Sequence, residues 1–272
     1  MPPPDLHEHI LHLLRGVIAT DRGAEPKLQE ALHLLAKYRS VLIQNTLIRE
    51  SGVVVRDGPF KGMTFVEQSA EGCHVPKLLG CYERELHPFI ETIPARRYAQ
   101  ILNIGCAEGY YAVGFKRLSP GTTVHAFDTN PAAQEACRSL AARNGVAIAV
   151  GGEFRPTDFA RFAGPTLVWC DIEGAEADLL DPGASPALAG MDLVVELHPS
   201  GNGHTLDRVP PRFSPSHEVE LVRLGGRDVN LPDFFRRLGH LDQLLAVWEW
   251  RQAPTPWAIM RSRAPAASGT RS

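Results

Sequence analysis

The sequence predicts an α/β fold whose mostly parallel sheet is covered by helices on both faces. From about residue 98 onward, short apolar runs with strand character alternate with helical segments, as in βαβ units. A turn with two glycines, "GCAEG" at 105–109, joins the first run to a helix, and the second run ends in Asp128 about twenty residues later. The ligand of such a sheet lies outside the carboxyl ends of the strands, so the turn and the acid are expected at one edge.

Residues 1–50 predict a helical N-terminal extension. Apolar residues at helical spacing indicate one helix over 5–19 and a second that begins near Pro26. His9 and His12 on the first helix are interpreted as solvated side chains rather than as a metal pair. Two helices cannot close a core alone, so we expect them to pack on the main domain or on a second copy of the chain. A homodimer through these helices is therefore a hypothesis.

Residues 51–97 predict a β-hairpin followed by a segment that could cover a ligand site. The stretch "VVVRDGPFKGMTFV" (53–66) has the strand–turn–strand pattern of a hairpin. The stretch "PKLLGCYERELHP" precedes the first strand of the sheet and is expected to lie over the site. Tyr82 and Glu83 are candidates for lid, cofactor or substrate contacts. An ordinary helix-capping role for Glu83 is an equally good interpretation.

Residues 98–262 predict the main α/β domain. Its strands are expected at 100–104, 122–127, 146–150, 166–170 and 192–197, and later at 217–222 and 256–261. The last two flank a helix expected around 232–246. By composition, the tail 263–272 is expected to be disordered.

The composition is that of an ordinary globular protein. The 272 residues are 44% hydrophobic and 22% charged, and the formal net charge is −3. This balance gives no field for a phosphate backbone, so a nucleic-acid partner is disfavoured. No basic segment precedes an apolar core at the N-terminus and no apolar run spans a bilayer, so neither a signal peptide nor a membrane partner is expected. Five scattered cysteines suggest a reducing compartment, which predicts a cytoplasmic protein.

The glycine turn indicates a ligand but does not identify it. One of Gly105 and Gly109 would let the chain turn sharply, and the other would let a ligand approach the main chain. The helix that follows would offer N–H groups to an electron-rich group. A nucleotide, a nicotinamide cofactor, S-adenosylmethionine (SAM) or simply a tight turn would each fit this pattern.

Two acids narrow the choice of ligand. Asp128 could accept hydrogen bonds from the two hydroxyls of a ribose, although it could also cap the helix that starts at Pro131. Glu108 would direct a negative charge toward any phosphate, and the turn lacks the Gly-x-Gly-x-x-Gly pattern of dinucleotide sites. SAM carries a sulfonium and an ammonium instead of phosphates, so the residues favour SAM.

Three stretches carry a family resemblance: "NIGCAEGYYAVGFKR", "HAFDTNP" and "CDIEGAEADLL". They resemble the class I SAM-dependent methyltransferases, most closely the FkbM-type branch, over residues about 100 to 198. The resemblance implies a Rossmann-like sheet with its last strand antiparallel, methyltransferase activity and SAM as cofactor. Two residues depart from the family pattern: Asn103 stands where an acid is usual, and Cys170 where a lysine is frequent. The resemblance therefore supports the fold and the cofactor more firmly than the acceptor. It implies cofactor contacts from Asn103, Gly105, Cys106, Ala107, Glu108, Gly109, Tyr110, Asp128, Thr129, Gly152, Glu153, Phe154 and Asp171.

An acidic rim is expected beside the cofactor. Asp171 and Glu173 follow the fourth strand, and Glu196 and His198 end the fifth, so each pair can share one face. If these strands are neighbours, as the class implies, the pairs lie one strand spacing apart, ~5 Å. Asp171, Glu196 and His198 could then hold Mg²⁺ or another divalent metal that deprotonates a substrate hydroxyl. Alternatively His198 is itself the general base, or the residues are structural, with Glu173 capping a helix.

The favoured function is SAM-dependent O-methylation of a small-molecule hydroxyl, such as that of a sugar or secondary metabolite, with or without a metal. The Gly/Pro-rich stretch 200–213 is a natural substrate loop, in which His204 and Arg212 could touch substrate. N-methylation of an amine and a non-catalytic SAM-binding module are the alternatives. A pure binder has no need of an acidic rim, which argues against the module.

Overall fold

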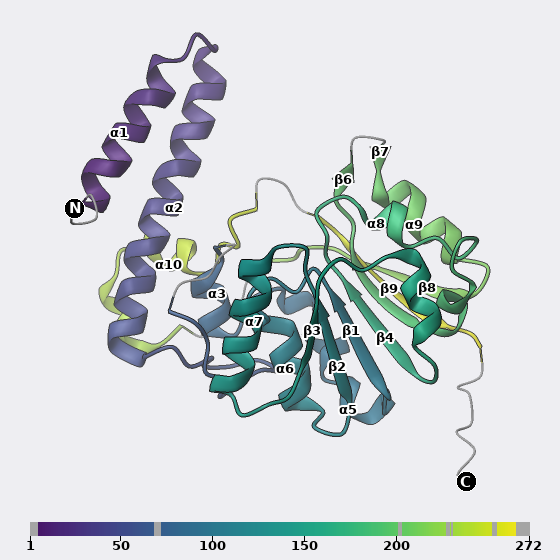
Figure 1. Ribbon diagram of the computed structural model, residues 1–272. Helices are drawn as coiled ribbons and strands as arrows, with labels where there is room; N and C mark the ends of the chain where they lie inside the picture. Colours follow the sequence, from purple (N-terminus) through teal and green to yellow (C-terminus); the bar gives the residue numbers. More distant parts are fainter. Residues whose placement is uncertain are drawn as a thin grey trace.

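The structure is a computed structural model that describes residues 5–67, 72–200, 203–226, 229, 231–251 and 255–264. A helical hairpin stands beside an α/β body (Figure 1). The helices, with 3₁₀ helices written η, are α1 Leu6–Ala19, α2 Ala24–Ser51, α3 His74–Leu79, η1 Arg84–Leu86, α4 His87–Ile90, α5 Ile93–Arg96, α6 Tyr110–Leu118, α7 Pro131–Arg143, η2 Pro156–Arg161, α8 Glu176–Leu179, η3 Pro186–Gly190, α9 Thr205–Phe213, η4 Asp233–Arg237 and α10 His240–Ala246. The strands are β1 Gln100–Ile104, β2 Thr123–Phe127, β3 Ala149–Gly151, β4 Thr166–Cys170, β5 Asp192–Glu196, β6 Pro199–Ser200, β7 Gly203–His204, β8 His217–Val222 and β9 Trp257–Ser262.

The main sheet has seven strands in the order β3-β2-β1-β4-β5-β9-β8. The first five in this order are mutually parallel, and β9 runs antiparallel to both of its neighbours, β5 and β8. This confirms the predicted Rossmann-like sheet with a late antiparallel strand. The order reverses at β1, whose neighbours are β2 and β4, and such a reversal is where an open sheet leaves a crevice for a ligand.

Apolar side chains of the central strands alternate between two cores. Ile101 and Trp169 point to the face covered by α6 and α7, whereas Leu102 and Val168 point to the face covered by α8 and α9. Because both faces are covered, the five residues of β4 are all buried, as expected for a central parallel strand. The sheet therefore holds the carboxyl ends of β1, β4 and β5 in fixed positions at one edge.

Four elements differ from the sequence-based expectations. The stretch 200–213, expected as a substrate loop, contains the helix α9 at Thr205–Phe213. The hairpin over 53–66 is shorter than expected: its arms pair through one antiparallel bridge, Val54 with Thr64, and through backbone hydrogen bonds of Val53 and Val55. Phe60 and Met63 in this segment are buried in the core. The helix expected around 232–246 is divided into η4 and α10, with extended backbone at Leu238 between them. β3 begins at Ala149, three residues later than expected. The tail beyond residue 264 lies outside the described residues.

The N-terminal helices form an antiparallel hairpin that reaches beyond the α/β body, and the lower part of α2 contacts α3 and α10 (Figure 1). α2 has 28 residues, which makes it about 42 Å long. A bidentate ion pair joins Arg39 of α2 to Asp242 of α10, with both N–O distances 2.6 Å. Among the helices of the described chain, none combines the length and the apolar character needed to cross a bilayer.

Candidate active site

A cavity of about 560 Å³ opens at the carboxyl ends of β1, β2 and β4. Seven of the residues expected to contact a cofactor line it: Gly105, Asp128, Thr129, Gly152, Glu153, Phe154 and Asp171. Its acidic lining residues are Asp128, Glu153, Asp171, Glu173 and Asp178, against one base, Arg155. Arg155 is itself paired with Glu153 at 2.8 Å. The lining therefore favours a cationic ligand over an anionic one.

The two glycines of the turn are required by contacts within the protein. Gly105 has φ 79° and Gly109 has φ 93°, values that side chains rarely adopt. A Cβ at Gly105 would overlap the main-chain carbonyl oxygen of Asp171, and a Cβ at Gly109 would lie 2.7 Å from the sulfur of Cys137. The second glycine thus allows α7 to approach closely, rather than giving a ligand access to the main chain as the sequence suggested.

The amide groups of the turn are largely used inside the protein. The N–H groups of Gly105 and Cys106 donate to the Phe127 carbonyl at 2.9 and 3.0 Å, and that of Gly109 donates to the Cys106 carbonyl at 2.8 Å. The N–H of Ala107 donates to the Asp128 carboxylate at 2.9 Å. A pyrophosphate would need such groups to be available, so this turn is unsuited to a dinucleotide.

Asp128 links the turn to the end of β2. Its Oδ2 accepts from Ala107 and its Oδ1 accepts from the N–H of Asn130 at 2.8 Å. The cap of α7 is Asn130, whose side chain accepts from Ala132, so Asp128 does not serve as that cap. A carboxylate has about four acceptor positions, which leaves Asp128 able to accept from a ligand in the cavity.

Glu108 and Tyr110, at the end of the turn, are buried and do not line the cavity. Glu108 is buried and forms an ion pair with Lys77 of α3, with 2.7 Å between Nζ and Oε1. The ring of Tyr110 packs edge-on against Phe60 and Phe65. The residues of the expected cofactor set that do not line the cavity are Asn103, Cys106, Ala107, Glu108, Gly109 and Tyr110. The expectation that Glu108 directs its charge toward the ligand therefore does not match its position.

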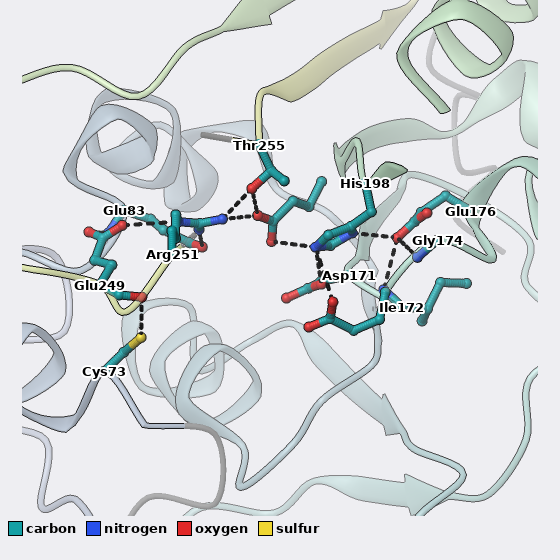
Figure 2. Close-up of polar contacts among 12 residues, drawn as sticks. Cys73, Glu83, Asp171, Ile172, Gly174, Glu176, His198, Glu249, Arg251 and Thr255 are labelled. Atoms are coloured by element: carbon teal, nitrogen blue, oxygen red, sulfur yellow. Dashed lines mark hydrogen bonds and ion pairs between the residues drawn. The ribbon is translucent and has the colours of Figure 1, made fainter. Parts of the chain in front are cut away.

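His198 contacts four acids, of which Asp171 and Glu176 are labelled in Figure 2. Its Nδ1 lies 2.9 Å from Oε1 of Glu176, which is fully buried. Its Nε2 faces three further acids: Asp171 at 3.8 Å, Glu173 at 3.5 Å and Glu196 at 3.7 Å. The structure thus brings together the acids and the histidine that the sequence placed at the ends of two strands. Asp171 and Glu173 follow β4, and Glu196 and His198 end β5 or follow it. They meet because β4 and β5 are paired, parallel neighbours in the sheet.

The charges around His198 alter its pKa. Burial lowers the pKa of this imidazole, but the hydrogen bond to Glu176 and the charges of Glu196, Glu176 and Glu173 outweigh burial and raise it above its ordinary value. Burial raises the pKa of Glu176, yet its bonds to His198 and to backbone N–H groups lower it overall. Glu176 is therefore a fixed carboxylate partner that makes His198 a stronger base.

Arg251 is surrounded by a second group of acids, next to the group around His198. Its guanidinium contacts Glu83 at 2.5 Å, Glu249 at 3.3 Å and also Glu196, which joins the two groups. Glu83 is buried and accepts from the hydroxyl of Tyr111. It occupies the N-cap position of η1, but its side chain makes no capping hydrogen bond there. Burial and the nearby charge of Glu196 raise the pKa of Glu83 to about 8.

Other residues expected near substrate have different positions. Glu173 is 84% exposed at the mouth of the site, where it could meet a substrate. Arg212 donates to the carbonyl groups of Ala177 and Leu180 and so holds α9 against α8. Tyr82 places its ring over the Lys77 ammonium, 5.0 Å from Nζ. His204 is exposed in the small β6–β7 ribbon.

Sequence reasoning missed four residues of the two groups: Glu176, Glu249, Arg251 and Thr255. Glu176 is the last acid of the quoted "DIEGAE" stretch, and its spacing of five residues from Asp171 could have drawn attention to it. The other three come from a segment after α10 that carries no motif. Only the folded chain brings that segment to the end of β5.

Ligand atoms of Asp171, Glu196 and His198 all lie within 4.8 Å of one another. Two oxygens and one imidazole nitrogen suit Mg²⁺, Mn²⁺ or Fe²⁺. With Nδ1 of His198 hydrogen-bonded to Glu176, Nε2 is left as the donor atom, an arrangement that is usual for metal-binding histidines. The residues present therefore fit a divalent ion.

The chain shows distant structural likenesses to known proteins. No protein-family model matches the chain, and no curated protein matches it. A precorrin-6y C5,15-methyltransferase from Geobacter metallireducens is similar over 74% of this chain and 97% of that one, with 11% identity and a TM-score of 0.49. An O-methyltransferase from Bacillus cereus in complex with SAH is similar over 97% and 93%, with 11% identity and a TM-score of 0.44. The O-methyltransferase TomG from Streptomyces achromogenes, in complex with SAM, is similar over 65% and 81%, with 15% identity and a TM-score of 0.45. None of these likenesses is close enough to carry a function to this chain.

Proposed function

We propose that the protein is a class I SAM-dependent methyltransferase of the FkbM type that methylates a hydroxyl of a small molecule. The observation that carries the proposal is the acidic cavity at the carboxyl ends of β1, β2 and β4, whose rim joins Asp128 to the centre around His198. In this proposal residues 98–262 form the catalytic domain and residues 51–97 cover it. The sequence resemblance over residues about 100 to 198 supports the same conclusion.

The cavity fits SAM in volume and charge. Its volume of about 560 Å³ is in the range of cofactor sites, and its lining holds five acids against one base. Asp128 would accept hydrogen bonds from the ribose, and Phe154 would lie beside the adenine. Since the turn amides are already bonded, a sulfonium compound fits better than a dinucleotide. When bound, the cofactor supplies an electrophilic methyl group.

His198 would act as the general base on the acceptor hydroxyl. Its Nε2 faces the site and would take the proton as the acceptor oxygen attacks the methyl carbon and the carbon–sulfur bond breaks. Glu176 would hold the ring by Nδ1, and the charges of Asp171 and Glu196 would stabilise the imidazolium formed. Positioning the acceptor in line with the bond that breaks would supply much of the rate.

In the alternative in which a divalent ion is bound, Asp171, Glu196 and His198 would be the residues that hold it, and Nε2 of His198 would then serve as a ligand instead of the general base. Such an ion, when bound, would lower the pKa of the acceptor hydroxyl. A second candidate function, N-methylation of an amine, is favoured by the acidic lining, because a cationic acceptor would be attracted to it.

The α1–α2 hairpin would associate with the hairpin of a second copy. The exposed large hydrophobic side chains on these two helices are Leu11, Leu13, Ile18, Leu28, Leu32 and Leu35. Residues 5–51 contain six acids and six Lys or Arg, so two hairpins would not repel one another. Light scattering after size exclusion would detect the dimer, and a monomer at all concentrations would contradict it. All five cysteines are free and buried, which is compatible with the cytoplasm.

Calorimetric titration of S-adenosylhomocysteine into the protein tests the cofactor. We expect micromolar binding that Asp128→Ala loses and Asp181→Ala, which removes an acid outside the cavity, retains. Transfer of labelled methyl groups from SAM to hydroxyl and amine acceptors then separates O- from N-methylation. Absence of S-adenosylhomocysteine binding would overturn the proposal, and binding without transfer to any acceptor would indicate a non-catalytic module.

A further inference from the structure

Arg251 lies where three buried carboxylates from separate parts of the chain converge (Figure 2). It contacts Glu83 before η1, Glu196 at the end of β5 and Glu249 after α10. The Arg251 side chain is 16% exposed, and the three carboxylate side chains are at most 3% exposed. Buried acids this close together require a counter-charge, and the guanidinium of Arg251 contacts all three of them.

The two oxygens of Glu196 have different partners. Oε1 accepts from Nη1 of Arg251 and from the hydroxyl of Thr255. Oε2 lies 3.7 Å from Nε2 of His198, on the side of the proposed acceptor. Arg251 and Thr255 therefore fix the carboxylate so that one oxygen is engaged and the other faces the site.

The two residues that precede Arg251 in the chain are held by contacts with other parts of the protein. Trp250 has φ 60° and packs against Gly72 so closely that a Cβ there would lie 2.5 Å from the indole ring. The sulfur of Cys73 donates to the Glu249 carbonyl at 2.7 Å. Lys37 of α2 lies over the Trp250 ring, 5.3 Å from its centroid. These contacts of Glu249 and Trp250 with the 72–73 segment and with α2 fix the chain from which the Arg251 side chain extends.

We propose that Arg251 is a positioning residue that acts through Glu196 as a built-in counter-cation and weakens the binding of a divalent ion at Asp171, Glu196 and His198. It does so in two ways: it occupies one oxygen of Glu196, and it places a positive charge beside the position of the ion. This inference rests on the proposed function, because it concerns the acceptor side of the same site. It assigns to Arg251 part of the charge compensation that a metal would otherwise provide.

The test is titration with Mn²⁺ alone at pH 8, followed by calorimetry and by the electron paramagnetic resonance signal of free Mn²⁺. Arg251→Met removes the charge and Arg251→Lys keeps it. Arg261→Met, which breaks the pair of this β9 residue with Glu220 on β8, is the control for loss of an arginine elsewhere. We expect Arg251→Met to bind Mn²⁺ at least about tenfold more tightly than the wild type, because two unit charges a few ångströms apart interact by more than that at a protein effective dielectric constant. Arg251→Lys and Arg261→Met should remain within about threefold of the wild type.

Adding Glu196→Gln to Arg251→Met should abolish the gain in Mn²⁺ affinity, because Arg251 acts on the ion through the Glu196 carboxylate. If Arg251→Met does not fold, the double variant Arg251→Met/Glu83→Gln lowers the buried negative charge and takes its place. The proposal would be overturned if the folded Arg251→Met variant, or its double variant, bound Mn²⁺ no more tightly than the wild type. It would also be overturned if Arg251→Lys gained as much Mn²⁺ affinity as Arg251→Met. Titration of S-adenosylhomocysteine into the same proteins tests the proposed function separately, because its failure would leave the Mn²⁺ comparison unaffected.

Discussion

Oε1 of Glu176 lies 2.9 Å from Nδ1 of His198 and accepts, at the same time, from the N–H groups of Ile172 and Gly174. One buried carboxylate oxygen therefore orients the histidine and closes the loop that follows β4. That loop carries Asp171 and Glu173, which face the other side of the same imidazole. The position of His198 and the conformation of the acidic loop are thus set by a single side chain.

Replacing Glu176 by Gln should impair methyl transfer without affecting the cofactor. Gln keeps the shape but loses the charge that holds His198 in one orientation, so we expect turnover to fall at least about tenfold. Affinity for S-adenosylhomocysteine should stay within about threefold, because Glu176 does not line the cavity. Glu220→Gln, which removes an acid on the surface of β8, is the control for rate and for calorimetry. Unchanged turnover in Glu176→Gln would contradict the role given to His198.

Local patterns predicted the sheet well because each strand is specified by its own residues. The strand expected at 166–170 is β4 residue for residue, since five apolar or small residues between a proline and an acid leave little choice of boundary. The Gly105 turn and Asp128 were expected at one edge for the same reason, as the order of strands follows from the βαβ pattern. Asp171, Glu196 and His198 come together because β4 and β5 are paired neighbours.

Partners distant in sequence could not be predicted in this way. Arg251 is 168 residues from Glu83 and 55 from Glu196, and nothing local to either acid indicates a guanidinium. The sequence predicts Glu108 beside the ligand, but its carboxylate forms a buried ion pair with Lys77 of α3, which lies 31 residues earlier in the chain. The hairpin over 53–66 is present only as a short antiparallel pairing around Val54 and Thr64, and Phe60 and Met63 within it are buried in the core.

Gly105→Ala should destabilise the protein by about 3 kcal/mol or more, because a positive φ and a clash with the main chain of Asp171 combine at this position. Gly121→Ala is the matched control: a Cβ there meets nothing within 4 Å, and we expect a change of less than about 0.5 kcal/mol. Urea unfolding of the two variants measures the difference. Similar midpoints would show that the end of β1 can shift away from β4.

Removing one partner of the buried pair Lys77–Glu108 should be more harmful than removing both. Lys77→Met leaves a buried carboxylate without its ammonium, which costs about 3 to 5 kcal/mol. Lys77→Met/Glu108→Leu should recover most of that loss, since an apolar pair suits the surrounding rings of Phe65, Tyr82 and Tyr110. The double variant should still bind S-adenosylhomocysteine, because Glu108 does not line the cavity. If a stable double variant no longer bound S-adenosylhomocysteine, Glu108 would have to be counted among the residues that bind the cofactor.

Acid should destabilise the protein partly through His74. This side chain is buried beside Phe65, and neither ring nitrogen has a hydrogen-bond partner among the residues that the structure describes. Burial, together with the charge of Lys77, lowers the pKa of His74 to about 4. In the unfolded chain His74 takes up a proton near pH 6.5, whereas in the folded chain it stays neutral until the pH approaches 4. The free energy of unfolding is therefore unaffected by His74 above pH 6.5 and decreases as the pH falls from 6.5 toward 4.

The expected loss between those pH values is up to about 3 kcal/mol. His74→Leu removes the titrating group and keeps the site apolar, so the free energy of unfolding should fall less steeply with acid in this variant. The two proteins are compared by urea unfolding at pH 7.5, 6.0, 5.0 and 4.5, and their difference isolates His74 from the carboxylates that titrate in both. His9→Leu, at an exposed position on α1, provides the control for loss of an ordinary histidine. Parallel curves for the wild type and His74→Leu would mean that His74 is protonated in the folded state, with water or a rearranged neighbour accepting from it.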